Sequence, residues 1–300
     1  MNKFVAERFY PKADFSTDAK IELAQQNHTV FSAVPYRCDK NATLYFNIDG
    51  IEAVMTEAEV SYPTSSYASA SACVGRKVCF VVVADTTDND GNRMLYLSRR
   101  AVQKQYCTDV LERMELGTII PCVITAVESF GAFCDIGCGV SSLIRKDRMS
   151  TSRIKDVRDR VREGDEVYAV VSEIDENGRI SLSMKELLGT WEENVASFSV
   201  GDVVAGIVRG VQDYGVFIEL APNLCGLSEN DIGCELSEGD RVSVRISKII
   251  PEKMKIKLFV MTKLPKSEEK AALRYYIKEG VIKEFVYSPK GCARTIKSVF

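Results

Sequence analysis

Residues 117–149 read GTIIPCVITAVESFGAFCDIGCGVSSLIRKDRM, and residues 162–185, beyond a charged loop, read REGDEVYAVVSEIDENGRISLSMK. In the last strand of this stretch, serines alternate with Ile180, Leu182 and Met184. Such alternation gives a strand one apolar and one polar face. A polar run that ends in glycine, residues 175–178, comes just before it and predicts a turn between two strands.

A glycine interrupts an earlier strand pattern, in the sequence SFGAF at residues 129–133. Glycine inside a strand pattern is typical of a bulge or a sharp bend, and small barrels need such bends to close. The bend would let the rings of Phe130 and Phe133 reach the same face. Five short strands in about 70 residues with these turns predict a five-stranded OB-fold barrel.

The same pattern recurs along the chain. FGAF at 130–133 is echoed by YGVF 84 positions later, and GDEV at 164–167 is echoed by GDRV at 239–242. A weaker copy lies upstream, where RMLYLS at 93–98 resembles RISLS at 179–183. An internal repeat on this scale indicates repeated structural units. We therefore predict a mainly β protein with three tandem five-stranded OB-fold barrels, short helical connectors and a small α/β C-terminal tail.

Turn and helix signals between the copies divide the chain into seven segments. Trp191, the only tryptophan, is expected to pack between neighbouring barrels, because an indole buries a large area. In the tail, residues 267–278 have a helical pattern and residues 281–287 a strand pattern. The segments are an N-terminal segment over 1–27, a divergent first OB-type repeat over 28–100, a helical connector over 101–116, a second repeat over 117–185, a linker over 186–200, a third repeat over 201–263 and a helix-strand tail over 264–300.

Composition excludes several classes of protein. With 46% hydrophobic and 27% charged residues the chain is typical of a globular protein, and its net charge of −3 argues against coating duplex DNA by bulk charge. No apolar run approaches the roughly 18 residues of a membrane span. The N-terminus lacks the apolar segment of a secretory signal. We expect a cytoplasmic protein with no membrane partner.

Metal and catalytic patterns are missing from the sequence. There are ten cysteines but no CxxC pair, and the one histidine, His28, is far from the closest cysteine pairs. A zinc site usually needs two paired ligand clusters, so we expect buried thiols that act as small hydrophobes, with no metal and no cofactor. With one histidine there is no evident Ser/His or Cys/His pair, and we expect no enzymatic activity.

The middle repeat carries the candidate binding residues. An OB barrel binds through strands two and three and the loops that join strands one to two and four to five. This places Phe130 and Phe133 on strand two, Arg145 on strand three, and Asp175 and Arg179 at the loop between strands four and five. Exposed rings stack on unpaired bases, at about 1–3 kcal/mol each, and guanidinium groups bind phosphate. Packing inside the core is the alternative for the two rings.

A basic loop follows strand three of this repeat. Residues 145–162 hold eight Lys or Arg against three Asp, in a chain that is otherwise acidic. Arg145 and Lys146 open the loop next to the predicted aromatic face, which favours contacts with phosphate groups. The alternative is a solvated surface without a ligand.

The third repeat keeps only part of this pattern. Tyr214 and Phe217 occupy the aromatic positions, and Lys255 stands where Arg179 stands. Glu229 falls at the position of Arg145. We therefore expect this repeat to bind RNA more weakly than the middle one.

The motifs FGAFCDIG, GDEVYAVV and NGRISLSMKE resemble the RNA-binding repeat of the ribosomal protein S-one family. The resemblance covers residues 28–263 and is strongest over 117–185. It implies an OB fold that binds single-stranded RNA, with Phe130, Phe133 and the Asp175–Arg179 loop at RNA-contacting positions. Arg145 stands where the family usually has histidine.

These observations predict a non-enzymatic protein that binds single-stranded RNA or mRNA and is linked to translation. The small ribosomal subunit is a candidate partner. Several weak barrels on one chain would raise the local concentration for each further contact. The alternative is a protein-docking adaptor on the ribosome or on an RNA-processing assembly, in which RNA contact is incidental.

Overall fold

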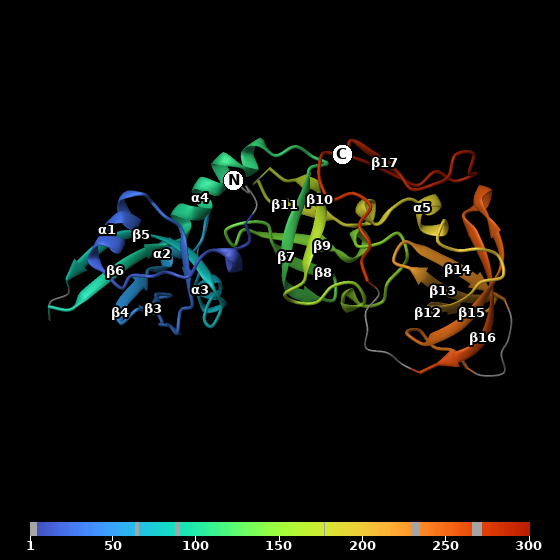
Figure 1. The fold of residues 1–300 in the computed structure, drawn as a ribbon, viewed down its shortest axis with the longest axis horizontal. Helices are drawn as coiled ribbons and strands as arrows, with labels where there is room; N and C mark the ends of the chain where they lie inside the picture. The colour runs from blue at the N-terminus through green and yellow to red at the C-terminus, as the bar shows by residue number, and fades with distance from the viewer. Residues whose placement is uncertain (1–4, 64–65, 88–90, 177, 230–234, 266–271) are drawn as a thin grey trace. The chain divides into compact units, whose positions relative to one another are not determined.

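The computed structural model describes residues 5–63, 66–87, 91–176, 178–229, 235–265 and 272–300 (Figure 1). The chain divides into two compact units. Unit 1 comprises residues 1–114 and 135–141, and unit 2 comprises residues 115–134 and 142–300. Every helix in these described ranges is too short or too polar to cross a membrane.

Unit 1 contains the first repeat as a curled sheet in the order β1-β5-β6-β4-β3-β2. The predicted barrel has five strands, and here the first of them is broken into β1 and β2 at residues 34–36. Pro35 lies in this break, and proline cannot donate a ladder hydrogen bond. β1 pairs with β5 and β2 pairs with β3. Together the two pieces therefore have the same two neighbours that an unbroken first strand would have. The strands are β1 (Phe31–Ala33), β2 (Arg37–Cys38), β3 (Leu44–Ile48), β4 (Ile51–Met55), β5 (Val78–Thr87) and β6 (Arg93–Ser98).

Short helices surround this sheet. The core of unit 1 joins the inner face of the strands, with Phe46, Phe80 and Leu95, to Phe15 and Ile21 near the first helix. Burying such side chains contributes about 1.5–3 kcal/mol each. The helices are η1 (Glu7–Phe9), α1 (Asp18–Gln26), α2 (Glu57–Val60), α3 (Tyr67–Ser71), α4 (Arg99–Asp109) and η2 (Leu111–Arg113).

Unit 2 holds two closed five-stranded barrels, as the sequence predicts for the second and third repeats. Their strand orders are β10-β11-β9-β8-β7 and β12-β13-β14-β16-β15. In both barrels the third and fifth strands pair in parallel, β9 with β11 and β14 with β16. The middle barrel consists of β7 (Ile119–Glu128), β8 (Gly131–Asp135), β9 (Ser141–Arg145), β10 (Glu166–Ile174) and β11 (Ile180–Ser183), and the third of β12 (Val203–Gln212), β13 (Gly215–Ala221), β14 (Leu224–Ser228), β15 (Arg241–Ile250) and β16 (Lys255–Leu264).

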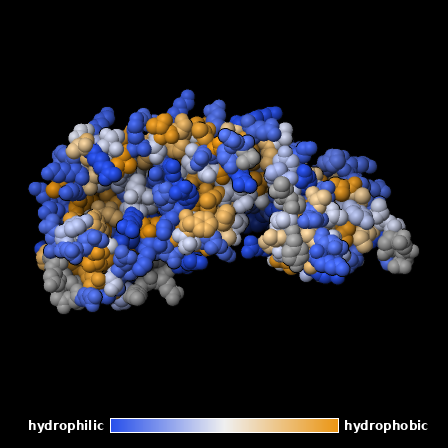
Figure 2. Space-filling view, turned by 180° about the vertical axis from the view of Figure 1, so that it is seen from behind, coloured by the Kyte–Doolittle hydropathy of each residue, from blue (hydrophilic) through white to orange (hydrophobic). Residues whose placement is uncertain are grey.

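The apolar residues of the alternating strand patterns fill the barrel interiors. Ile180 and Leu182 are buried in the middle barrel, and Val242 and Val244 are buried in the third. Trp191 is also buried and belongs to the hydrophobic cluster of the third barrel. On the side shown in Figure 2, hydrophobic side chains reach the surface in separate groups among hydrophilic ones. The short helices of this unit are η3 (Lys146–Arg148), η4 (Val157–Asp159), η5 (Lys185–Leu188), α5 (Trp191–Val195) and η6 (Pro251–Lys253).

The C-terminal segment differs from its prediction. Of the helix expected over 267–278, residues 267–271 lie outside the described residues, and residues 272–278 are not helical. Tyr276 of this stretch instead donates its backbone N–H to the carbonyl of Leu187 in η5, at 2.9 Å. Farther on, the strand expected over 281–287 contains β17 (Glu284–Val286), which pairs with β18 (Lys297–Val299).

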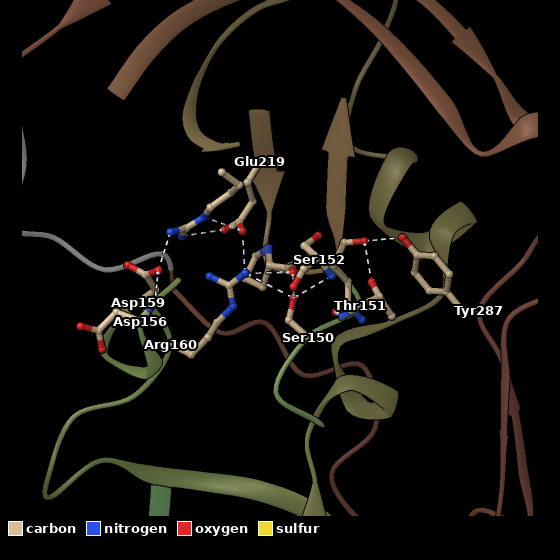
Figure 3. Close-up of polar contacts among 11 residues, drawn as sticks. Ser150, Thr151, Ser152, Asp156, Asp159, Arg160, Glu219 and Tyr287 are labelled. Atoms are coloured by element: carbon tan, nitrogen blue, oxygen red, sulfur yellow. Dashed lines mark hydrogen bonds and ion pairs between the residues drawn. The ribbon is translucent and has the colours of Figure 1, made fainter. Parts of the chain in front are cut away.

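A buried ion-pair network links the two barrels of unit 2 (Figure 3). Nη2 of Arg160, from the loop that follows β9, lies 2.6 Å from Oε2 of Glu219 on β13. Nε of Arg209 on β12 lies 3.0 Å from the same oxygen, and its Nη1 lies 2.6 Å from Oδ2 of Asp159. The Arg160 side chain is 0% exposed. One of the eight basic residues of the 145–162 loop, which the sequence groups as candidates for phosphate contact or for a solvated surface, is therefore a buried structural residue.

We predict that Glu219→Gln destabilises unit 2 by about 3–5 kcal/mol, because it leaves two buried guanidinium groups without their shared carboxylate. Equilibrium denaturation of the full chain in urea measures this change. Glu229→Gln is the matched control, since Glu229 lies 3.3 Å from Lys257 in an exposed pair. Such pairs contribute about 0–1 kcal/mol. Equal, small effects of the two substitutions would contradict a stabilising role for the network.

Candidate nucleic-acid interface

Phe130 and Phe133 form an aromatic pair on the outside of the middle barrel. Their ring centroids are 6.1 Å apart and the ring planes are at 87°, which is an edge-to-face arrangement. Phe130 is 54% exposed, and Phe133 is half-buried. The sequence prediction put both rings on strand two, but Phe130 lies in the two-residue turn before β8 and only Phe133 lies on the strand.

The residues between the rings explain why the rings face outward. Ala132 and Cys134 are both 0% exposed and fill the interior positions of β8. Because side chains alternate along a strand, Phe133 must then point outward. A Cβ on Gly131 would lie 2.5 Å from the carbonyl oxygen of Ile144 on β9. The predicted glycine bend is thus a close approach of two backbones that no larger residue permits.

Arg145 and Lys146 lie beside this aromatic pair. The N–H of Lys146 donates to the carbonyl of Phe130 at 2.9 Å, which holds the turn against the end of β9. The exposed guanidinium of Arg145 has its Nε 3.1 Å from Oδ1 of Asp147. A shallow groove at this point is lined by Ser129, Phe130, Leu143, Arg145, Lys146 and Asp147. The sequence did not single out Leu143, although its alternation with buried Ile144 would have placed it on the outer face.

Asp175 and Arg179 form the turn between β10 and β11. Oδ1 of Asp175 accepts a hydrogen bond from the backbone N–H of Arg179 at 2.8 Å, and both side chains are exposed. β9 and β11 run parallel, with Ser181 opposite Leu143. Arg179 is therefore near the start of β9 and Arg145 at its end, about 13 Å apart along the strand. The predicted residues spread along one wall instead of forming a compact cluster.

The third barrel repeats the aromatic geometry but not the charges. The ring centroids of Tyr214 and Phe217 are 6.1 Å apart at 90°, and the two residues are 64% and 37% exposed. A Cβ on Gly215 would lie 2.5 Å from the carbonyl oxygen of Ser228, as at Gly131. Glu229 occupies the position of Arg145. Lys255, the remaining predicted residue, is exposed at the start of β16.

Several basic side chains of the 145–162 loop form ion pairs within the chain. Nζ of Lys155 lies 3.5 Å from Oε2 of Glu238, and Nη1 of Arg158 lies 3.6 Å from Oδ1 of Asp156. Arg145 and Lys146 are the two basic residues that line the groove at the aromatic pair. No alternation or spacing in the loop sequence distinguishes the buried Arg160 from the exposed basic residues.

The S1 RNA binding domain family matches residues 113–185. This segment is an S1 domain. The chain is also homologous to bacterial bS1 proteins: it is 30% identical over 221 residues to the small ribosomal subunit protein bS1 homolog of Bacillus subtilis, covering 68% of this chain and 57% of that protein. For the small ribosomal subunit protein bS1 of Leuconostoc lactis the values are 32% over 197 residues, 60% and 46%.

The chain spans about half the length of these relatives. Among solved structures, one similar chain is a multidomain protein with nucleic acid binding domains from Streptococcus pneumoniae. It is 14% identical, and the match covers 80% of this chain and 76% of that one at a TM-score of 0.26.

We predict that Gly131→Ala destabilises the S1 domain by about 1–3 kcal/mol, because the added methyl group collides with the β9 backbone. Urea denaturation of the full chain measures the loss. Gly210→Ala is the control, because a Cβ there would meet no atom closer than 4.0 Å. Equal stability of the two variants would show that the close approach at Gly131 is unimportant.

Proposed function

We propose that the chain binds single-stranded RNA through the outer wall of its S1 domain, and that this binding is linked to the ribosome and to translation. The observation that carries the proposal is the exposed edge-to-face pair of Phe130 and Phe133 beside Arg145 and Lys146. Unpaired bases stack on such rings at about 1–3 kcal/mol per base. The S1 domain match and the bS1 relatives support the same function.

In this proposal the basic and acidic residues position the RNA backbone. Arg145 can bind a phosphate group through two N–H donors, and Lys146 acts as a point charge next to it. Arg179 provides a second phosphate contact toward the other end of the wall. Asp175 can accept a hydrogen bond from a ribose 2′-hydroxyl, which would favour RNA over DNA.

The third barrel provides a second, weaker contact. Tyr214 and Phe217 have the ring geometry of the S1 domain pair, and Lys255 would contact a phosphate group. Glu229 repels phosphate at the position where Arg145 attracts it. Because both barrels lie in one compact unit, RNA bound to one is held at high local concentration near the other.

The proposed partners are mRNA and, through translation, the small ribosomal subunit. Each bS1 relative is described as a small ribosomal subunit protein, and this description supports the assignment. The proposal places the chain in the cytoplasm and includes no catalytic step, since stacking and phosphate contacts need none.

We predict that replacing both Phe130 and Phe133 with alanine weakens binding to an unstructured RNA at least tenfold. Two lost stacking contacts exceed the roughly 1.4 kcal/mol that a tenfold change requires. Fluorescence anisotropy with a labelled oligouridylate measures the affinity. Phe9→Ala is the control, because Phe9 is also exposed, at 53%, but lies in unit 1.

Both variants must keep the thermal unfolding midpoint of the wild type. Unchanged affinity of the double variant would refute this site. If the protein also retained its partners from lysate after RNase treatment, the docking-adaptor alternative would replace RNA binding.

A further inference from the structure

A second wall of the third barrel carries exposed apolar side chains in an ordered row. Val203 on β12 lies opposite Arg245 on β15, and Arg245 lies opposite Phe259 on β16. Val203 is 55% exposed and Phe259 is 44% exposed, and Met261, at the register shift two residues after Phe259, is 50% exposed. The guanidinium carbon of Arg245 lies 5.6 Å from the centroid of the Phe259 ring. This row is distinct from the Tyr214–Phe217 pair.

The same row in the S1 domain is covered. Its residues are Ile119, Val170 and Ser183, which pair across β7, β10 and β11 in the same order. They are 6%, 0% and 0% exposed. Ile119 and Val170 belong to a hydrophobic cluster that also includes Tyr275 and Phe300 of the C-terminal segment. One wall is thus closed by the chain itself, while the equivalent wall of the third barrel is open to solvent.

The charge of the open wall identifies its ligand class. β15 and β16 together carry six Lys or Arg and no Asp or Glu, whereas β10 and β11 carry two Glu and no Lys or Arg. Two of these six basic side chains form ion pairs with nearby carboxylates. Nζ of Lys257 lies 3.3 Å from Oε1 of Glu229, and Nζ of Lys263 lies 2.6 Å from Oδ2 of Asp240. Within the hairpin itself, residues 241–264, the single acid is Glu252 in the turn. Positive charge combined with the exposed Phe259 ring favours a strand of nucleotides over a neutral or basic protein surface.

A continuous path joins this wall to the aromatic pair. Phe217 lies opposite Leu227 on β14, and Leu227 lies opposite Lys257 on β16, two residues before Phe259. Two strand spacings separate β13 from β16, which is about 10 Å. A shallow groove lies along this path and is lined by Leu227, Glu229, Ser247, Lys257, Leu258 and Phe259.

We propose that the wall formed by Val203, Arg245, Phe259 and Met261, reached past Lys257, is a second binding surface for single-stranded RNA. An RNA strand that leaves Tyr214 and Phe217 crosses Lys257 and stacks a base on Phe259, while Arg245 binds a phosphate group. The inference rests on the proposed function, because it extends an RNA strand that is proposed to lie on the Phe130–Phe133 and Tyr214–Phe217 pairs.

The test uses the full chain, fluorescence anisotropy and two oligouridylates. One has about 6 nucleotides, within the site of a single barrel, and one has about 30, enough for two barrels. Phe259→Ala should weaken binding of the long RNA about fivefold or more, and Phe259→Tyr should stay within about twofold of the wild type. Arg245→Gln should lower the slope of log affinity against log salt by about 0.7.

Val286→Ala is the control, because Val286 is 42% exposed on β17, outside the wall, and should bind like the wild type. The inference is overturned if Phe259→Ala and Arg245→Gln leave the affinity and salt slope of the long RNA unchanged. The S1 domain site still stands in that case if the double Phe130 and Phe133 variant loses the short RNA. If that variant binds both RNAs normally, the proposed function fails as well.

Discussion

The close approach of β8 to β9 at Gly131 is the constraint on which the proposed binding site depends. Without a side chain at that position, the backbone packs against the carbonyl of Ile144. The short residues Ala132 and Cys134 then fill the interior, so the interior has no room for the two phenyl rings. The same constraint acts at Gly215, and both barrels present their rings at a centroid distance of 6.1 Å.

The buried network around Glu219 connects the two barrels that carry these aromatic pairs. Ion pairs in a protein interior are costly to desolvate, so they hold only in one well-defined geometry. With Arg160 from one barrel and Arg209 from the other on a single carboxylate, the two barrels keep one relative arrangement within unit 2. A fixed arrangement reduces the entropy lost when one RNA strand contacts both barrels.

Much of the fold follows from the sequence because alternation and turn residues act locally. Residues 180–184 and 242–246 could be assigned to strands on alternation alone, and the repeat supplied the barrel count. Long-range contacts determine the rest. The buried guanidinium of Arg160 binds Glu219 of another barrel, and Tyr276, within the expected helix, donates its N–H to η5 instead. The exposure of the wall at Phe259 could not be predicted from the sequence for the same reason, since it depends on where the C-terminal segment packs.

The central claim is that paired rings on the outer walls of the two barrels hold unstacked bases. Ultraviolet crosslinking of the full chain to an oligouridylate, followed by mass spectrometry of the crosslinked peptides, tests it directly, because crosslinks form where a base lies against a side chain. The account predicts crosslinks within residues 129–133 and 214–217. Crosslinks confined to unit 1 or to the C-terminal segment would contradict it.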